Sequence, residues 1–152
     1  MVDRIAFTRV RLPYGWMGNM SPHPVTWRGQ SYRTTEALFQ AMRFTDLSMR
    51  EMIRAELSPM GAKMKAKGNA AKMVIEPCGE QDCLNMLECL ELKLHFHPEL
   101  RRELTATGDA IITEDITARL NKGGNHRFWG AGLQDDEWIG ENMLGQLWMF
   151  IR

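Results

Sequence analysis

The sequence predicts an α+β fold: a helix-dominated single domain over residues 1–152 with a small β-sheet. Three observations lead to this expectation. The chain up to residue 30 alternates weakly between apolar and polar residues and is interrupted by prolines and glycines, which is typical of short strands joined by turns. Most later segments carry apolar residues at helical spacing. A length of 152 residues suits one domain, and the chain contains no internal repeat or linker.

The first third of the chain supplies local signals for strands and helices. Short strands are expected at residues 5–10 and 25–27. The first helix is expected within residues 34–44, with the threonine at its start as the N-cap. Ser48 and Glu51 have the spacing of a capping box and predict the start of a second helix.

The remaining elements follow from proline, glycine and apolar spacing. Ser58 before Pro59 predicts the start of a third helix, which Gly68 and Asn69 can end. The other expected elements are helices at residues 82–96, 98–107 and 142–151, a short strand at residues 110–113, and a glycine-containing loop at residues 121–125.

The helix within residues 34–44 has an unusual distribution of polar side chains. Glu36, Gln40 and Arg43 fall on one narrow stripe, and the residues around them are apolar or small. A surface helix has a limited apolar face, so this helix is expected to be buried nearly all round. Because a buried carboxylate needs partners, the stripe should line either a structural polar network or a ligand cavity. Arg43 has a further option, which is to emerge at the surface at the helix end.

Lys93 is a second anomaly. With about 100° between successive residues of a helix, it falls opposite the acidic face of the predicted helix at residues 82–96. Its neighbours there are Met86, Cys89, Leu90 and Phe96. A lysine on an apolar face either extends to water or meets a partner, and Glu36 is the candidate. Desolvation would lower the pKa of this lysine and make it a nucleophile or base; the alternative is a structural ion pair.

Two further residues, Trp129 and Lys63, each have two interpretations, whereas no pattern in the sequence indicates a metal or cofactor site. Trp129 lies in a glycine-flanked segment and is suited either to stack on a planar ligand or to cover the core. Lys63 and its neighbouring lysines follow a predicted helix start, which suits phosphate binding or a solvated face. No motif indicates a metal or cofactor, so neither is expected. The three cysteines match no zinc spacing and are expected to be free thiols.

The charge balance and the amino terminus bear on partners and location. The 19 basic and 19 acidic residues cancel, so a broad nucleic-acid footprint is not expected, although local recognition of a nucleotide remains compatible. The amino terminus lacks the apolar run of a signal peptide, and no apolar stretch is long enough to span a bilayer. We therefore expect a cytoplasmic location, no membrane association and no obligate protein partner.

Several short motifs follow one another through almost the whole chain. They are WMGNMSP at residues 16–22, the helical segment 36–44, SPMGAK at 58–63, LKL at 92–94 with PEL at 98–100, TG at 107–108 leading to ITE at 112–114, FWG at 128–130, GENMLG at 140–145 and the last residues, 149–152. Each motif is weak alone, but their order and spacing are specific. Together they resemble the NADAR family, the YbiA-like N-glycosidases named for NAD and ADP-ribose.

The resemblance implies a YbiA-like fold and hydrolysis of a bond between ribose C1 and a nitrogen. By the same resemblance, several residues fall on the pocket motifs of the family. We expect Glu36, Lys93 and Glu114 to be catalytic, and the following residues to bind substrate: Asn19, Gln40, Arg43, Lys63, His126, Trp129, Gly130 and Asn142. Members commonly carry an aspartate at the position of His126, so the substrate preference of this chain is expected to depend on that change.

The expected substrate is an ADP-ribosylated guanine nucleotide or nucleic acid. Breaking a ribosyl C–N bond builds positive charge at C1, which Glu36 could stabilise, while a neutral Lys93 could attack C1 and form a Schiff base. One alternative is hydrolysis of riboflavin-biosynthesis intermediates such as aminouracil ribosyl phosphates, on which some family members act. Another is a non-catalytic module that binds ADP-ribose or NAD.

Overall fold

The computed structural model describes residues 3–152 and confirms a helix-dominated α+β fold. The chain divides into two compact units. We call Asn19–Pro98 the central unit; the terminal unit consists of the chain up to Gly18 together with Glu99–Arg152. The prediction that residues 1–152 form a single domain stays a prediction, and each unit is described by itself below.

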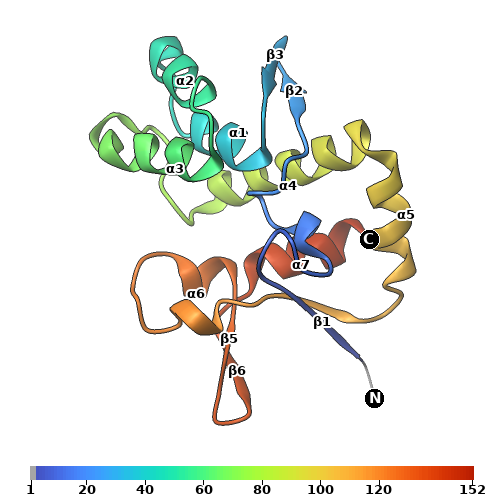
Figure 1. Cartoon of the computed structure of the whole chain (residues 1–152). Helices are drawn as coiled ribbons and strands as arrows, with labels where there is room; N and C mark the ends of the chain where they lie inside the picture. The colour runs from blue at the N-terminus through green and yellow to red at the C-terminus, as the bar shows by residue number, and fades with distance from the viewer. Residues whose placement is uncertain (1–2) are drawn as a thin grey trace. The chain divides into compact units, whose positions relative to one another are not determined.

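The central unit is built around one buried helix. Its elements are β2 (Val25–Trp27), β3 (Gln30–Tyr32), α1 (Thr35–Met42), α2 (Leu47–Arg54), α3 (Pro59–Gly68), a 3-10 turn η2 (Ala70–Lys72) and α4 (Glu80–Phe96). Helix α1 packs against α2, α3 and α4, while β2 and β3 form an antiparallel hairpin beside α4 (Figure 1). Every residue of α1 is buried, which confirms the expectation from its composition.

The terminal unit is centred on strand β4. Its elements are β1 (Arg4–Phe7), η1 (Gly15–Met17), α5 (Pro98–Ala106), β4 (Ile111–Glu114), η3 (Thr117–Arg119), α6 (His126–Trp129), β5 (Gly132–Gln134), β6 (Glu137–Ile139) and α7 (Met143–Ile151). Strand β1 pairs in parallel with β4, in register from Arg4 opposite Ile111 to Phe7 opposite Glu114. Helix α7 packs against β4, with Trp148 fully buried (Figure 1).

Two predicted helix starts are confirmed and one is displaced. The Thr34 hydroxyl accepts a hydrogen bond from Ala37 N at 3.1 Å, and the Ser58 hydroxyl accepts one from Gly61 N at 2.9 Å. The second helix starts earlier than its capping-box pattern suggests. Its N-cap is Asp46, whose carboxylate accepts from the amide of Ser48 at 2.8 Å and from its hydroxyl at 2.7 Å. A carboxylate is a strong cap acceptor, so it displaces the serine.

The strands differ most from the prediction. The first ends at Phe7 because its partner β4 ends at Glu114, so residues 8–10 lie outside the ladder. Within residues 3–152 the strands form three two-stranded sheets, of which β2–β3 and β5–β6 are antiparallel hairpins. The β5–β6 hairpin was not predicted. Its turn is made by Asp135 and Asp136, both with positive φ (50° and 65°), and this pair lacks the glycine that usually marks such a turn.

Helix α4 carries its polar and apolar faces largely as predicted. Glu88, Glu91 and His95 lie on the solvent side, whereas Lys93 is fully buried. Phe96, expected on the apolar face, is 42% exposed because the helix ends at this residue before Pro98. Within residues 3–152, no helix has the length and apolar character needed to cross a bilayer.

Candidate active site

The polar stripe of α1 forms a hydrogen-bonded chain. Gln40 Nε2 donates to Glu36 Oε1 at 3.0 Å, and Arg43 NH1 donates to Gln40 Oε1 at 3.3 Å. All three side chains are buried. Gln40 therefore joins a carboxylate at one end of the helix to a guanidinium at the other. Gln40 and Arg43 therefore take part in a buried polar network, which is one of the two arrangements expected for this stripe.

Arg43 forms an ion pair with Asp82, a partner that was not predicted from the sequence. Its Nε and NH2 atoms donate to the two carboxylate oxygens of Asp82 at 2.9 and 2.7 Å, and Asp82 is fully buried at the start of α4. Cys78 N also donates to Asp82 Oδ2 at 2.9 Å, and the guanidinium lies 4.5 Å from the centre of the Phe39 ring. A bidentate, buried ion pair of this kind gives Arg43 a structural role. The option that Arg43 emerges at the surface is wrong.

Glu36 lies in the first turn of α1, where the exposed amides of a helix N-terminus favour negative charge. Asn19 holds this end of the helix. Its backbone carbonyl accepts from Glu36 N at 3.0 Å, and its side-chain Oδ1 accepts from the Thr35 hydroxyl at 2.8 Å. Asn19 Nδ2 lies 3.1 Å from the sulfur of Met86. Asn19 thus fixes the end of α1 that carries Glu36. Its predicted role in substrate binding stays a prediction.

Lys93 is the most unusual group in the central unit. It is fully buried on α4, and its Nζ donates to the hydroxyl of Ser21 at 2.9 Å. Burial lowers the pKa of Lys93 from 10.5 to about 7, and the interaction with Cys89 acts in the other direction. An ammonium loses its hydration when it is buried, so the neutral amine is favoured. The predicted desolvation of Lys93 is therefore present, and near pH 7 a large share of the side chain is a neutral amine.

Glu36 and Lys93 belong to one electrostatic neighbourhood. Burial raises the pKa of the Cys89 thiol well above its ordinary value; Glu88, Glu36 and Asp82 raise it further, while Lys93 lowers it. Both the carboxylate of α1 and the amine of α4 therefore act on the same buried thiol. Whether Glu36 is the direct partner of Lys93 stays a prediction.

The polar side chain of Ser21 connects Lys93 to a histidine. Ser21 is fully buried, and its Oγ lies 2.8 Å from Nδ1 of His23. The ring of His23 in turn packs edge-on against that of His97, with 4.9 Å between ring centres. Neither Ser21 nor His23 was singled out from the sequence. Only the motif at residues 16–22, which contains Ser21, pointed to this segment.

In the terminal unit, Glu114 is positioned by Asn142. Asn142 Oδ1 accepts from Glu114 N at 3.0 Å, and Asn142 Nδ2 donates to Ile112 O at 2.9 Å. Asn142 itself has a left-handed backbone, with φ of 53°, at the start of α7. Both ends of its amide hold β4 next to Glu114. The predicted role of Asn142 in substrate binding stays a prediction. Glu114 is partly buried, and its Oε1 lies 3.8 Å from Arg119 NH2.

Gly130 also serves β4 through its lack of a side chain. A Cβ atom at this position would lie 2.6 Å from Glu114 O and 2.7 Å from the side chain of Ile116. The neighbouring Ala131 N donates to Glu114 O at 2.9 Å. The glycine therefore allows the segment after α6 to approach the end of β4 closely.

His126 and Trp129 lie at the two ends of the short helix α6. Both are partly buried, and the Trp129 ring packs edge-on against Phe128 with 4.8 Å between ring centres. Arg127 Nε donates to Leu120 O at 2.9 Å, which fixes α6 against the preceding loop. The roles predicted for His126 and Trp129 in substrate binding stay predictions.

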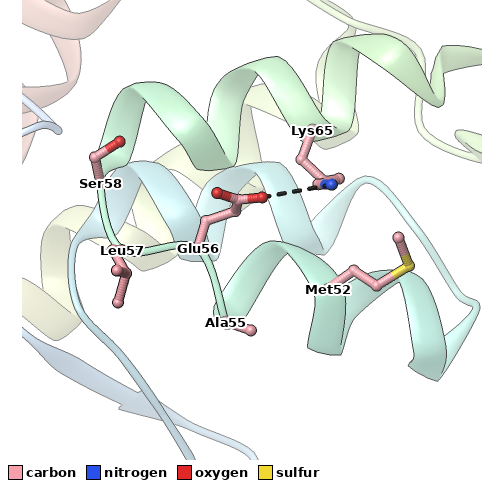
Figure 2. Close-up of a pocket in the computed structure, with 6 residues that line it drawn as sticks. All are labelled: Met52, Ala55, Glu56, Leu57, Ser58 and Lys65. Carbon is pink, nitrogen blue, oxygen red and sulfur yellow. Dashed lines mark ion pairs between the residues drawn. The ribbon is translucent and has the colours of Figure 1, made fainter.

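Lys63 lies on α3, partly buried, on a helix that packs against α1. A shallow, open depression of about 400 Å³ lies at the start of the same helix. It is lined by Met52, Ala55, Glu56, Leu57, Ser58 and Lys65 (Figure 2). An ion pair of 3.5 Å between Glu56 and Lys65 crosses it (Figure 2). None of the predicted site residues is among its lining residues, so this depression is not the predicted substrate pocket.

The cysteines and the other side chains that could bind a metal ion are considered together. Cys89 is a buried free thiol, as expected, and Cys78 and Cys83 are partly buried. Among residues 3–152, no three or more His, Cys, Asp or Glu side chains are grouped so that they could hold a metal ion.

Comparison with known proteins identifies the family. The NADAR domain family matches residues 6–152. The N-glycosidase YbiA of Escherichia coli (strain K12) is 33% identical over 141 residues, which is 91% of this chain and 80% of the relative. The N-glycosidase Npun_R5314 of Nostoc punctiforme is 28% identical over 154 residues, 97% of this chain and 90% of the relative.

A solved structure supports the same assignment. The NMR structure of the Escherichia coli protein YbiA is similar to this chain with a TM-score of 0.81 and 31% sequence identity, over 100% of this chain and 84% of that one. The predicted resemblance and the YbiA-like fold are confirmed, and so is the prediction of a glycosidase enzyme. The chain belongs to the NADAR domain family.

Proposed function

We propose that this glycosidase cleaves the bond between ribose C1 of an ADP-ribosyl group and a guanine nitrogen, in a nucleotide or a nucleic acid. The observation that carries the proposal is Lys93: a fully buried amine with a pKa of about 7, on a helix packed against the helix of Glu36. The choice of an ADP-ribosylated guanine rests on the resemblance to family members that release ADP-ribose from guanine. A cytoplasmic location is part of the same proposal.

Lys93 is proposed as the nucleophile. Its neutral amine attacks ribose C1, and the C1–N bond to the base breaks with its electron pair going to the leaving nitrogen. The bond between C1 and the ring oxygen then breaks, and its electron pair and the proton of Nζ go to that oxygen, which gives a Schiff base between Lys93 Nζ and C1. Water adds to C1, the C1–Nζ bond breaks, and the sugar and the free amine are released. The net reaction consumes one water molecule and leaves its proton on the base.

Glu36 is proposed to stabilise the positive charge that builds at C1 and to accept a proton from the attacking water. Its position supports this role, since Asn19 fixes the start of α1 and Gln40 holds one carboxylate oxygen at 3.0 Å. The second oxygen is then the one that would act on the substrate. Asn19 and Gln40 would therefore be positioning residues.

The residues of the terminal unit are proposed to contribute to substrate binding and acid–base chemistry. Glu114 is the candidate for a second catalytic carboxylate, and Asn142 fixes the backbone on which it lies. Trp129 is the candidate for stacking on a base, and His126 for setting substrate preference. We also propose that the two units act as one domain, because the family match runs through both of them.

A panel of substrates tests the proposal. The purified chain is incubated with ADP-ribosylated guanosine, an ADP-ribosylated oligonucleotide and an aminouracil ribosyl phosphate, and the products are identified by mass spectrometry. Release of ADP-ribose from either guanine substrate is expected. Lys93→Met should lose this activity, and Lys72→Met, which alters an exposed lysine of the same unit, is the matched control that should keep it. Turnover of the aminouracil compound alone would contradict the ADP-ribosyl-guanine assignment.

Glu36→Gln separates an enzyme from a binding module. The amide has nearly the same shape as the carboxylate but can neither take a proton nor carry a charge. An enzyme should lose turnover and keep its ligand, as followed by kcat and by the Kd for ADP-ribose. Binding of ADP-ribose without turnover of any substrate, in the unaltered chain, would instead favour the non-catalytic module.

A further inference from the structure

Three side chains in the central unit form a continuous hydrogen-bonded path. Lys93 Nζ lies 2.9 Å from Ser21 Oγ, and Ser21 Oγ lies 2.8 Å from His23 Nδ1. Lys93 and Ser21 are fully buried, whereas His23 is partly exposed. The path therefore leads from the buried amine towards the surface through one hydroxyl.

The protonation states of Lys93 and His23 determine which group donates and which accepts in each hydrogen bond of this path. A serine hydroxyl has one hydrogen to donate and lone pairs to accept with. When Lys93 donates to Ser21 Oγ, the hydroxyl hydrogen can be donated to His23 Nδ1, which accepts it in the neutral tautomer with its proton on Nε2. When His23 is protonated, Nδ1 donates to Ser21, and the hydroxyl can donate to a neutral Lys93 in return. Both hydrogen bonds of the path thus exist in either protonation state.

The segment that carries Ser21 and His23 is held rigidly. His23 N donates to Ser21 O at 2.8 Å, which closes a tight turn. Pro22 and Pro24 flank the histidine, and each fixes its own φ and restricts the residue before it. His97, at the end of α4, contacts the His23 ring and places its Nε2 2.8 Å from Pro24 O. The turn is therefore tied to the helix that carries Lys93.

We propose that Ser21 and His23 form a proton relay that serves Lys93 during the reaction. The relay rests on the proposed function, in which Lys93 bonds to ribose C1. It assigns a role to two residues that are outside the predicted catalytic set. His23 accepts the proton and later returns it, and the hydroxyl of Ser21 transfers the proton between Lys93 and His23.

The relay moves one proton in each direction. After the C1–Nζ bond forms, the nitrogen of Lys93 carries one proton too many. It passes that proton to Ser21 Oγ as Ser21 passes its own to His23 Nδ1, which leaves a neutral adduct and a protonated imidazole. In the hydrolytic step the proton returns by the same path to Nζ. The C1–Nζ bond then breaks with its electron pair staying on nitrogen, and both Lys93 and His23 return to their neutral forms.

Several ionisable groups surround this path. Cys89 lies on the same helix as Lys93 and acts on its charge, and Glu36 and Asp82 act on Cys89 in turn. His97 lies against His23. A variant that removes the imidazole of His23 leaves the carboxylates and the thiol in place, so its effect on the pH profile reports on the relay.

The key variant is His23→Asn. Asparagine places a hydrogen-bonding group near the position of Nδ1, so it can keep the contact with Ser21, but it cannot take up a proton near neutral pH. The expected result is a fall in kcat of about 10²-fold, an unchanged KM, and loss of one limb of the kcat–pH profile. Ser21→Ala should lower kcat similarly. Imidazole added to His23→Ala should restore part of the lost rate.

The control is His95→Asn, which alters an exposed histidine of α4 and should leave kcat and the pH profile unchanged. Wild-type kcat with a wild-type pH profile in His23→Asn would overturn the relay, because a purely structural contact would survive in that variant. In that case the active wild-type chain would still support the proposed function. A wild-type chain inactive on every substrate would overturn the proposed function, and the relay with it.

Discussion

The central unit buries two basic side chains in two different ways. Arg43 is matched by the carboxylate of Asp82, with hydrogen bonds of 2.9 and 2.7 Å from two of its nitrogens. Lys93 donates to a neutral hydroxyl, that of Ser21, and burial lowers its pKa to about 7. The first arrangement keeps a charge in place, whereas the second favours loss of that charge.

Within the central unit, this difference distinguishes a structural basic group from a reactive one. A buried ion pair with good geometry resists change, since removing either partner leaves an uncompensated charge. A buried amine that is largely neutral near pH 7 has a lone pair available for attack on carbon. We therefore propose that Arg43 and Asp82 belong to the framework of the site and that Lys93 takes part in the reaction. The following predictions test this division, beginning with the largest expected effect.

Lys93→Met should abolish the reaction and spare the fold. Methionine fills nearly the same space without an amine, so kcat should fall by about 10³-fold or more. The free energy of unfolding should stay the same or rise, because a desolvated amine is replaced by an apolar chain. Steady-state kinetics and urea denaturation measure the two effects. Full activity in this variant would remove Lys93 from the mechanism.

Asp82→Asn should destabilise the fold. It leaves the guanidinium of Arg43 buried without a carboxylate, and the free energy of unfolding should fall by about 3–5 kcal/mol. Urea denaturation measures this, with Asp109→Asn, at an exposed position, as the control. A loss no larger than in the control would mean that Arg43 and Asp82 do not form a framework pair.

Asn142→Ala extends the comparison to a neutral side chain whose amide oxygen and amide nitrogen both form hydrogen bonds. It removes the hydrogen bonds to Glu114 N and Ile112 O, so the free energy of unfolding should fall by about 1–3 kcal/mol. The kcat should also fall if Glu114 is catalytic, since its backbone loses an anchor. If stability and kcat both stay at their wild-type values, Asn142 has no positioning role.

The pH dependence of stability should carry a signature of Lys93. Its pKa is about 7 in the folded chain and 10.5 as an ordinary lysine, so between these values the unfolded chain binds more protons than the folded chain. The free energy of unfolding should therefore rise with pH by about 1.4 kcal/mol per pH unit from about pH 7 to pH 10, as the contribution of this group. Below about pH 7 both states bind the proton, so this group adds no further slope.

The measurement is the difference between the wild-type chain and Lys93→Met in urea denaturation at a series of pH values. Subtracting the variant removes the contributions of the other titrating groups. Parallel curves for the two proteins would show that Lys93 stays charged in the folded chain.

Glu51→Gln should have the smallest effect. Glu51 and Arg54 form an ion pair of 2.7 Å on α2, with the Glu51 side chain 56% exposed and the Arg54 side chain 29% exposed. Exposed pairs of this kind contribute little, so the urea midpoint should not move measurably. A shift as large as that of Asp82→Asn would contradict the distinction between buried and exposed pairs.

Local features of the fold could be predicted from the sequence. The caps at Thr34 and Ser58 depend on residues three positions apart, and the buried face of α4 depends on helical spacing. The burial of Lys93 follows from the same spacing. These signals lie within one element, so a single sequence contains them.

The partners of the buried groups could not be predicted. Asp82 lies 39 residues from Arg43, Ser21 lies 72 residues from Lys93, and Asn142 lies 28 residues from Glu114. Such pairs form only when separate elements pack, and nothing in the local pattern specifies them. The β5–β6 hairpin was missed for a different reason: two aspartates, in place of a glycine-containing pair, adopt the left-handed backbone of its turn.

The central claim is that Lys93 attacks the ribosyl carbon, and chemical trapping tests it most directly. The chain is turned over on ADP-ribosylated guanosine in the presence of borohydride, digested, and analysed by peptide mass spectrometry. The account predicts a stable ribosyl adduct on Lys93, with none on the same peptide of Lys93→Met. Complete turnover with no adduct on Lys93 would contradict it.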